Sequence, residues 1–169
     1  MTANVKTREL QMRPFVETDR QAMGALLTNE EIKKTYMIPD LPTDEAVDRL
    51  FVRFLELSRA EEHYVAGVYL ENRLIGFLND VENDGVRIEL GYVIAPEYQG
   101  RGYATQILTA AMADLFSRGY QEVAAGAFEE NPASIRVMVK AGMTKTDLEE
   151  DIEYRGKTHH CVYYSAKKA

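Results

Sequence analysis

The apolar residues of this chain switch several times between a strand period and a helix period, and these switches predict its elements. Residues 10–16 indicate a short first strand, and Thr18 with Gln21 has the spacing of a capping box that opens a helix. Thr43 is expected to cap a second helix, because the apolar residues after it recur at helical spacing: Val47, Leu50, Phe51, Phe54 and Leu55. Each helix therefore has one face suited to packing against a sheet.

The middle of the chain has the strand period. Residues 64–70, 74–81 and 86–94 are candidate strands, and short turn-forming segments connect them. Short connections of this kind join antiparallel neighbours. The pattern therefore predicts an antiparallel meander at the centre of the sheet.

Helical spacing returns after the meander. Residues 104–116 are expected to form a helix that ends at Gly119. Residues 122–127 are expected to return as a strand parallel to the last meander strand, through a right-handed crossover. A further helix opens at Asn131, which precedes a proline, and residues 143–165 suggest a terminal hairpin.

Together these elements predict a single α+β domain over residues 1–169, with its core at residues 10–166. The sheet is expected to be twisted and mixed but mostly antiparallel, with helices on both faces. No internal repeat, low-complexity tract or linker divides the chain.

Residues 28–42 contain two prolines, several charges and the apolar group Tyr36, Met37 and Ile38. A long loop inside a compact domain is often functional, so this segment is a candidate for the mouth of a binding site. A plain connection between two helices explains the composition equally well. The sequence leaves both interpretations open.

The chain has 169 residues and a formal net charge of −7, with 46% hydrophobic and 28% charged residues. This acidic balance argues against nucleic acid as a partner and is compatible with a cationic substrate. The start of the chain has no signal-peptide core, and no apolar run reaches membrane length. Cys161 is the single cysteine, which excludes an internal disulfide, and a cytoplasmic location is expected.

The most informative stretch is residues 88–105, in which a strand stops at Pro96, a glycine turn follows and a helix begins. The first N–H groups of a helix have no partner within it, and they bind anions together with the positive end of the helix dipole. Gly100 and Gly102 leave the backbone open to such an anion, and Arg101 adds a positive charge. The stretch therefore predicts a phosphate site.

Two common phosphate-binding motifs do not fit this turn. A Walker A loop needs Lys and Ser or Thr after its last glycine, whereas Tyr103 and Ala104 follow Gly102. A dinucleotide fingerprint needs a third glycine or alanine where Thr105 stands, and it opens a βαβ unit rather than following a meander. The remaining pattern is QxxGxA, made by Gln99, Gly102 and Ala104.

This pattern resembles the pyrophosphate signature of the GNAT family of N-acetyltransferases. Three further stretches extend the resemblance: RPF at residues 13–15, ELGYVIAP at residues 89–96 and NPASIRVMVKAGM at residues 131–143. The resemblance covers residues 10–165, and the sequence looks most like the branch that contains the ribosomal-protein N-terminal acetyltransferases. It implies the GNAT fold, in which the sheet splays between its fourth and fifth strands, and acetyl-CoA as the acyl donor.

The resemblance also implies where acetyl-CoA binds. The turn would hold its pyrophosphate through Gln99, Gly100, Arg101, Gly102, Tyr103, Ala104 and Thr105. The strand end at Tyr92, Val93 and Ile94 would pair with the pantetheine arm, because it offers free N–H and C=O groups. Asn131 would hydrogen-bond the pantetheine and also cap its helix.

Transfer to an amine needs a base that removes the ammonium proton and a group that supports the leaving thiolate. Glu89 on the central strand is the first candidate base, and a solvated strand face is the plainer interpretation of this residue. Glu153 is the second candidate, in an acidic run that usually forms a solvated edge. By resemblance, Ser134 lies near the thioester sulfur, and Met138 replaces a tyrosine acid that many relatives have.

The chain departs from the resembled branch near its end, where His159, His160 and Cys161 stand before the last strand. These three contiguous residues do not make one tetrahedral zinc site without other ligands, so we assign no metal. We expect an exposed histidine pair, with substrate binding as the alternative, and a buried structural cysteine.

The sequence thus predicts an acetyl-CoA-dependent N-acetyltransferase that acts by direct attack in a ternary complex. The acceptor would be a primary amine, either a protein N-terminal α-amine or a small molecule, and the sequence does not choose between them. The alternative is a catalytically silent module of the same fold that binds acyl-CoA. A homodimer through the late strands is compatible with the resemblance, and the sequence leaves the oligomeric state open.

Overall fold

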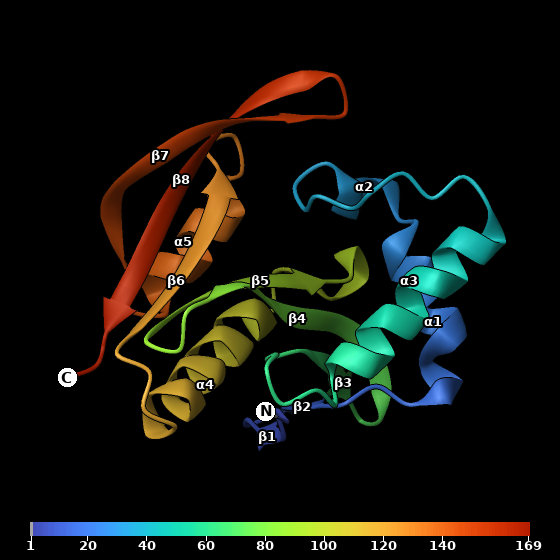
Figure 1. Cartoon of the computed structure of the whole chain (residues 1–169), viewed down its shortest axis with the longest axis horizontal. Coiled ribbons are helices and arrows are strands. Elements are labelled where there is room, and N and C mark those ends of the chain that lie inside the picture. Colours follow the sequence, from blue (N-terminus) through green and yellow to red (C-terminus); the bar gives the residue numbers. More distant parts are fainter. Residues whose placement is uncertain (1) are drawn as a thin grey trace.

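The computed structural model describes residues 2–169, and their strands belong to one sheet (Figure 1). The strands are β1 Val5–Lys6, β2 Leu10–Arg13, β3 Ala66–Leu70, β4 Arg73–Asn83, β5 Arg87–Ile94, β6 Glu122–Phe128, β7 Thr144–Tyr154 and β8 Lys157–Lys167. Their order across the sheet is β1-β2-β3-β4-β5-β6-β8-β7. The mixed α+β architecture predicted from the sequence is confirmed.

Strand pairing follows the predicted meander. β2, β3, β4 and β5 are antiparallel neighbours, whereas β6 runs parallel to β5. β8 and β7 complete the sheet in antiparallel order as the predicted terminal hairpin. The first predicted strand is shorter than expected, since β2 ends at Arg13. Pro14 follows it, and a proline nitrogen cannot donate to a neighbouring strand.

The helices are α1 Arg20–Leu27, α2 Glu30–Lys33, α3 Asp44–Leu57, α4 Tyr103–Ser117 and α5 Pro132–Lys140. Thr43 caps α3 as predicted, because its Oγ1 accepts a hydrogen bond from the N–H of Ala46 at 3.1 Å. Gly119 and Gly142 follow α4 and α5 with positive φ angles of 105° and 96°. These are the left-handed C′ positions that glycine favours.

The start of α1 differs from the prediction. A 3₁₀ turn at Glu17–Asp19 precedes the helix, and the capping box between Thr18 and Gln21 is wrong. Asp19 takes this role instead, since its Oδ2 accepts hydrogen bonds from the N–H of Val16 at 2.9 Å and from the hydroxyl of Tyr69. The Asp19 carboxylate accepts both bonds and so ties the helix start to the sheet.

The helices cover the two faces of the sheet separately. α4 and α5 pack on one face, in a buried cluster that includes Ile88, Leu90, Ile107, Leu108 and Met138. α1 and α3 pack on the other face, in a second cluster that includes Met23, Leu27, Phe51, Phe77 and Val93. Because side chains alternate along a strand, β5 contributes to both cores.

The sheet opens between β5 and β6. Their parallel register runs from Arg87 opposite Glu122 to Leu90 opposite Ala125, and no pair follows. Both strands nevertheless continue, β5 to Ile94 and β6 to Phe128. This is the splay that the resemblance implies, and it leaves the ends of two parallel strands apart.

The tip of the β7–β8 hairpin reaches across to the segment around α2 (Figure 1). The hydroxyl of Tyr154 lies 2.6 Å from the carbonyl oxygen of Lys33 and 3.2 Å from that of Tyr36. Arg155 forms an ion pair with Glu30 at 2.9 Å. We call this contact between residues 154–155 and residues 30–38 the arch, because it joins the last hairpin to the first helices.

None of the helices within residues 2–169 combines the length and the apolar character that crossing a membrane requires.

Candidate active site

A cavity of about 840 Å³ lies at the splay between β5 and β6. Its lining comes from distant parts of the chain: residues 31–37, the ends of β4 and β5, the turn at 96–105, and α5 with β6 to β8. The segment at residues 28–42, for which the sequence left two interpretations open, contributes to this lining through α2 and Tyr36. The arch spans the same segment, so this part of the chain is more than a connection.

The glycine turn presents its backbone to the cavity. Within residues 2–169, no group accepts a hydrogen bond from the N–H groups of residues 101–105, and the first bond of α4 runs from Gln106 to Gly102. Gly100 and Gly102 have φ angles of 77° and 81°, and a methyl group on either would meet no protein atom within 4 Å. The free N–H groups and the open space beside them fit a bound diphosphate.

Two side chains of the turn brace it. The Nε2 of Gln99 donates to the carbonyl oxygen of Ile94 at 2.9 Å, which ties the turn to the end of β5. The guanidinium of Arg101 donates to the carbonyl oxygen of Glu97 at 3.3 Å and is exposed. The turn therefore has a fixed shape before any ligand binds.

The start of α5 faces the strand end. Asn131 caps α5, because its Oδ1 accepts from the N–H of Ser134 at 3.3 Å. The Ser134 hydroxyl lies 2.8 Å from the hydroxyl of Tyr92 on β5, and all three residues line the cavity. Burial raises the pKa of Tyr92 to about 12, so this phenol keeps its proton near neutral pH.

Glu89 lies on the opposite face of β5 from Ile88 and Leu90, and it too lines the cavity. Glu89 is only 9% exposed, so the interpretation that it lies on a solvated face of the strand is wrong. Burial, followed by the charge of nearby Glu82, raises the pKa of the Glu89 carboxyl above its ordinary value. A carboxylate with a raised pKa and access to a cavity is suited to accept a proton.

Two further carboxylates line the cavity near Glu89. Glu82 stands opposite Glu89 in the β4–β5 register, next to a bulge, and Glu150 projects from β7. The hydroxyl of Tyr163 donates to Glu150 at 2.6 Å. Among the described residues, no lysine or arginine forms an ion pair with any of these three carboxylates. This part of the cavity therefore holds three carboxylates that have no ion-pair partner, and the nearby charge of Arg87 offsets that of Glu89 only in part.

The cavity thus has two chemically different sides. The turn at residues 96–105 and α5, with Arg136 and Lys140, make one side, which we call the helix side. Glu82, Glu89 and Glu150 with residues 31–37 make the other, which we call the acidic side. The helix side offers backbone donors and cations to an anion, and the acidic side attracts a cation.

Glu153, the second candidate base, lies away from this cavity. It is exposed, accepts a hydrogen bond from the hydroxyl of Thr158, and lines a separate cavity of about 510 Å³ beside the arch. Alternation along β7 explains this position, because Ile152 faces the main cavity and its neighbour Glu153 faces away. The structure brings Glu89 and Ser134 to one cavity and leaves Glu153 outside it.

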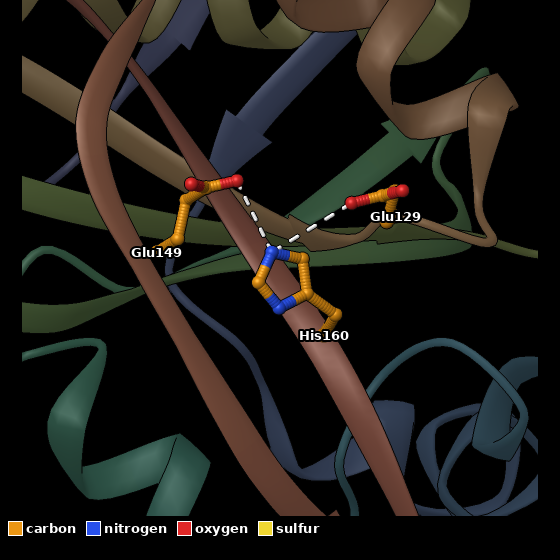
Figure 2. A group of neighbouring side chains, drawn as sticks. All are labelled: Glu129, Glu149 and His160. Atoms are coloured by element: carbon orange, nitrogen blue, oxygen red, sulfur yellow. Dashed lines mark hydrogen bonds and ion pairs between the residues drawn. The ribbon is translucent and has the colours of Figure 1, made fainter.

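The two histidines differ, which corrects the expectation of an exposed pair. His159 is 6% exposed, stacks on Phe128 with ring centroids 4.3 Å apart, and contacts Glu130 through Nδ1. His160 is exposed and is surrounded by carboxylates (Figure 2). Its Nδ1 lies 2.8 Å from Asp151, and its Nε2 lies 3.1 Å from Glu149 and 3.7 Å from Glu129.

These contacts explain the charge state of the His160 cluster. Hydrogen bonds to Asp151 and Glu149 raise the pKa of the His160 imidazole, so its protonated form balances the carboxylates. Glu129, Glu149 and His160 could each offer one atom to a metal ion, but none of the three lines the main cavity. A metal ion held there would therefore lie outside that cavity.

Cys161 also lines the main cavity and is buried. Burial raises the pKa of its thiol, which disfavours the nucleophilic thiolate at neutral pH. A structural role, as expected from the sequence, agrees with this environment.

Several residues of the cavity escaped the sequence analysis. The sequence gives no signal for the side chain of Tyr92, and Glu150 belongs to the acidic run at residues 147–153, which the sequence predicts to be a solvated edge. Tyr36 donates to Asn79 over Gly91, where a methyl group would come within 3.2 Å of the Tyr36 ring. A glycine in a central strand was the one local signal for this contact.

The chain is similar to known acetyltransferases. Residues 9–144 match the family described as an acetyltransferase (GNAT) domain. The uncharacterized N-acetyltransferase YoaA of Bacillus subtilis (strain 168) is 24% identical over 159 residues, which cover 91% of this chain and 90% of YoaA.

Solved structures show the same fold. RimL, a ribosomal alpha-N-protein acetyltransferase in complex with coenzyme A, has a TM-score of 0.85 at 20% identity, covering 99% of this chain and 98% of RimL. Spermidine N-acetyltransferase from Vibrio cholerae, in complex with CoA and spermine, has a TM-score of 0.79 at 18% identity, covering 94% and 95% of the two chains.

Proposed function

The chain belongs to the GNAT family of acetyltransferases, and from this membership we propose that it transfers the acetyl group of acetyl-CoA to a primary amine by direct attack. The observation that carries the proposal is Glu89, a buried carboxylate with a raised pKa in a cavity that also contains an open anion site. We propose that residues 1–169 form one N-acetyltransferase domain with its core at residues 10–166. Its cytoplasmic location stays a prediction from the sequence.

The helix side of the cavity fits acetyl-CoA. The free N–H groups of residues 101–105 would hold the pyrophosphate, and Gly100 and Gly102 leave room for it. The strand end at residues 92–94, which has no partner in β6, would pair with the pantetheine amides, and the Asn131 amide would join them. Acetyl-CoA supplies an activated acyl group on a thiol leaving group.

The acidic side fits an amine that arrives as an ammonium ion. Glu82, Glu89 and Glu150 would attract the cation, since none of the three forms an ion pair with a lysine or arginine among the described residues. Glu89 would then take the ammonium proton, directly or through a water molecule, and leave the free amine to attack. We assign this step to Glu89 rather than Glu153, because Glu153 faces a different cavity.

The acceptor is proposed as a class, the primary amines. RimL acts on a protein N-terminus and the Vibrio cholerae enzyme on spermidine, according to their names, and both have the fold of this chain. A peptide N-terminus and a small amine present the same ammonium group to Glu89. Residues 31–37 and the arch would distinguish them by the rest of the acceptor molecule, beyond its ammonium group.

Thiol release from acetyl-CoA tests this proposal. The panel should contain small primary amines, peptides with free N-termini, and the same peptides with blocked N-termini as matched controls. We expect thiol release with at least one free amine and none with its blocked counterpart. Tight binding of acetyl-CoA without thiol release for any acceptor would reject the transferase and favour a silent acyl-CoA-binding module.

A further inference from the structure

The side chain of Tyr92 links the central strand to the start of α5. Its hydroxyl lies 2.8 Å from Ser134 Oγ and 3.2 Å from the Ser134 carbonyl oxygen. Both residues are half-buried and line the cavity. Met138 lies one helical turn further along α5 and is fully buried in the core. Ser134 is therefore the residue of α5 that offers a hydroxyl group to the cavity, and Tyr92 on β5 is its partner.

The pair and Glu89 lie on opposite faces of the same strand. Ile88 and Leu90 point toward α4 and α5, and Tyr92 packs against the same cluster. Glu89 points to the other face, toward the acidic side of the cavity. A thioester that enters the splay would thus have the base on one face of the sheet and the hydroxyl pair on the other. This separation suits a reaction in which the amine attacks from one side and the sulfur leaves on the other.

We propose that Tyr92 is a positioning residue for the leaving thiolate: it donates its proton to Ser134 Oγ and so directs the Ser134 hydroxyl at the sulfur. This inference rests on the proposed function. Ser134 alone could rotate its hydroxyl proton toward several acceptors, since a serine hydroxyl is free to turn. A hydrogen bond received from Tyr92 occupies a lone pair of Oγ and favours the orientation toward the cavity. The pKa of about 12 keeps Tyr92 protonated, so it remains a donor throughout turnover.

The reaction balances without proton transfer from Tyr92. The amine nitrogen forms a bond to the acetyl carbon, the carbon–sulfur bond breaks, and its electron pair stays on sulfur. Glu89 receives the proton that the ammonium group loses before the attack, and the second proton, which the nitrogen loses as the amide forms, passes to solvent. Ser134 donates a hydrogen bond to the thiolate and keeps its own proton, and the thiolate is protonated by solvent after release. Tyr92 acts only through Ser134, by a charge-assisted chain of two hydrogen bonds.

The ionisation of the bound CoA thiol tests the proposal without any acceptor. Thiolate absorbance is followed against pH in complexes of CoA with wild type, Tyr92→Phe, Ser134→Ala and the double variant. Complexes with desulfo-CoA provide the matched subtraction for protein tyrosines. We expect the CoA thiol to be more acidic in the wild-type complex than in the complexes of the variants. Its ionisation constant should differ by roughly tenfold, which corresponds to the one hydrogen bond that each variant loses. Both single variants and the double variant should show the same loss.

Steady-state kinetics give the second readout. Tyr92→Phe should lower kcat roughly tenfold with little change in the KM for acetyl-CoA, and it should have no further effect in the Ser134→Ala background. Tyr120→Phe is a matched control outside the cavity, since it loses one hydroxyl bond to Asn83 at 3.0 Å, and its kcat should equal that of wild type.

Each outcome separates this inference from the proposed function. The positioning role would be overturned if the CoA thiol were equally acidic in the wild-type and Tyr92→Phe complexes. It would also be overturned if Tyr92→Phe lowered kcat by the same factor in the wild-type and Ser134→Ala backgrounds. A rise in KM at unchanged kcat would also overturn it and leave Tyr92 as a pantetheine contact. Wild type that binds no CoA, or that releases no thiol with any amine, would instead contradict the proposed function.

Discussion

The two sides of the cavity are built in different ways. The helix side comes mostly from one continuous stretch, the turn at residues 96–105, and its binding groups are backbone N–H groups. The acidic side takes its carboxylates from β4, β5 and β7 and its cover from residues 31–37. A site made of local backbone can be recognised in a sequence, whereas a site assembled by tertiary contacts cannot. Substitutions on each side test this contrast.

The largest effect is expected from Gly102→Asp on the helix side. The carboxylate would stand beside the N–H groups of residues 101–105 and repel a diphosphate, so CoA affinity should fall at least about a hundredfold. Calorimetric titration with CoA measures the loss. Gly102→Asn is the matched control, because asparagine also tolerates the φ angle of 81° but has no charge. Equal affinity in the two variants would show that the anion binds elsewhere.

The next effect is expected from Glu89→Gln on the acidic side. Loss of a general base lowers turnover by about 10²–10⁴-fold, and here the loss should be greatest above the raised pKa of Glu89 and below the pKa of the amine, where Glu89 is ionised and the acceptor is an ammonium ion. CoA affinity should stay at the wild-type value, which separates the two sides. The pH profile of kcat/KM measures the effect.

Wild type should show an acid limb in that profile. Activity falls as the pH drops through the raised pKa of Glu89, because the protonated carboxyl cannot accept a proton. Glu153→Gln is the matched control on the neighbouring surface and should keep the wild-type profile. If Glu153→Gln lost activity and Glu89→Gln did not, the base would have to be reassigned.

Much of the fold followed from the sequence for physical reasons. The meander and α4 follow from apolar periodicity, short turns and glycine positions, which are local signals, whereas the splay is implied only by the family resemblance. The capping box at Thr18 is wrong because Asp19 instead closes the preceding turn on the N–H of Val16 and is held by Tyr69, 50 positions away. Local rules do not include such a partner.

The site was predictable in the same uneven way. An acid on a central strand is rare, which makes Glu89 a candidate in the sequence, but its raised pKa depends on its burial and on the charges of Glu82 on β4 and Glu150 on β7. Glu150 and Glu153 look alike in the acidic run, and only the β7–β8 register decides that Glu150 faces the cavity. His159 differs from His160 for the same reason, since one side of β8 faces Phe128 and the other faces solvent.

A smaller effect is expected from the arch. Tyr154→Phe removes the hydroxyl contacts to Lys33 and Tyr36, so residues 30–38 should open more often and hold the acceptor less well. We expect a rise of about three- to tenfold in the acceptor KM. CoA affinity should remain that of wild type, and hydrogen exchange should be faster in residues 30–38. A changed CoA affinity would mean that the arch supports the whole cavity rather than its acidic side.

The smallest effect concerns stability, and it again separates the two sides. Glu89 is a buried carboxylate whose folded pKa lies above the unfolded value of 4.5, so the folded state binds more protons between these two values. Stability therefore falls as the pH rises through that window, and at pH 7 the charged carboxylate destabilises the fold in full. Glu89→Gln should raise Tm at pH 7 and increase the free energy of unfolding by about 0.5–2 kcal/mol. Both gains should vanish near pH 4.

Glu153→Gln, which removes an exposed carboxylate from the same hairpin, should leave Tm unchanged at both pH values. Gly102→Asn should give no gain either, because the N–H groups of the turn are open to solvent and impose no comparable penalty. A Tm for Glu89→Gln at or below that of wild type at pH 7 would mean that the charge of Glu89 is compensated in the folded state. In that case its raised pKa could not be the reason that it serves as the base.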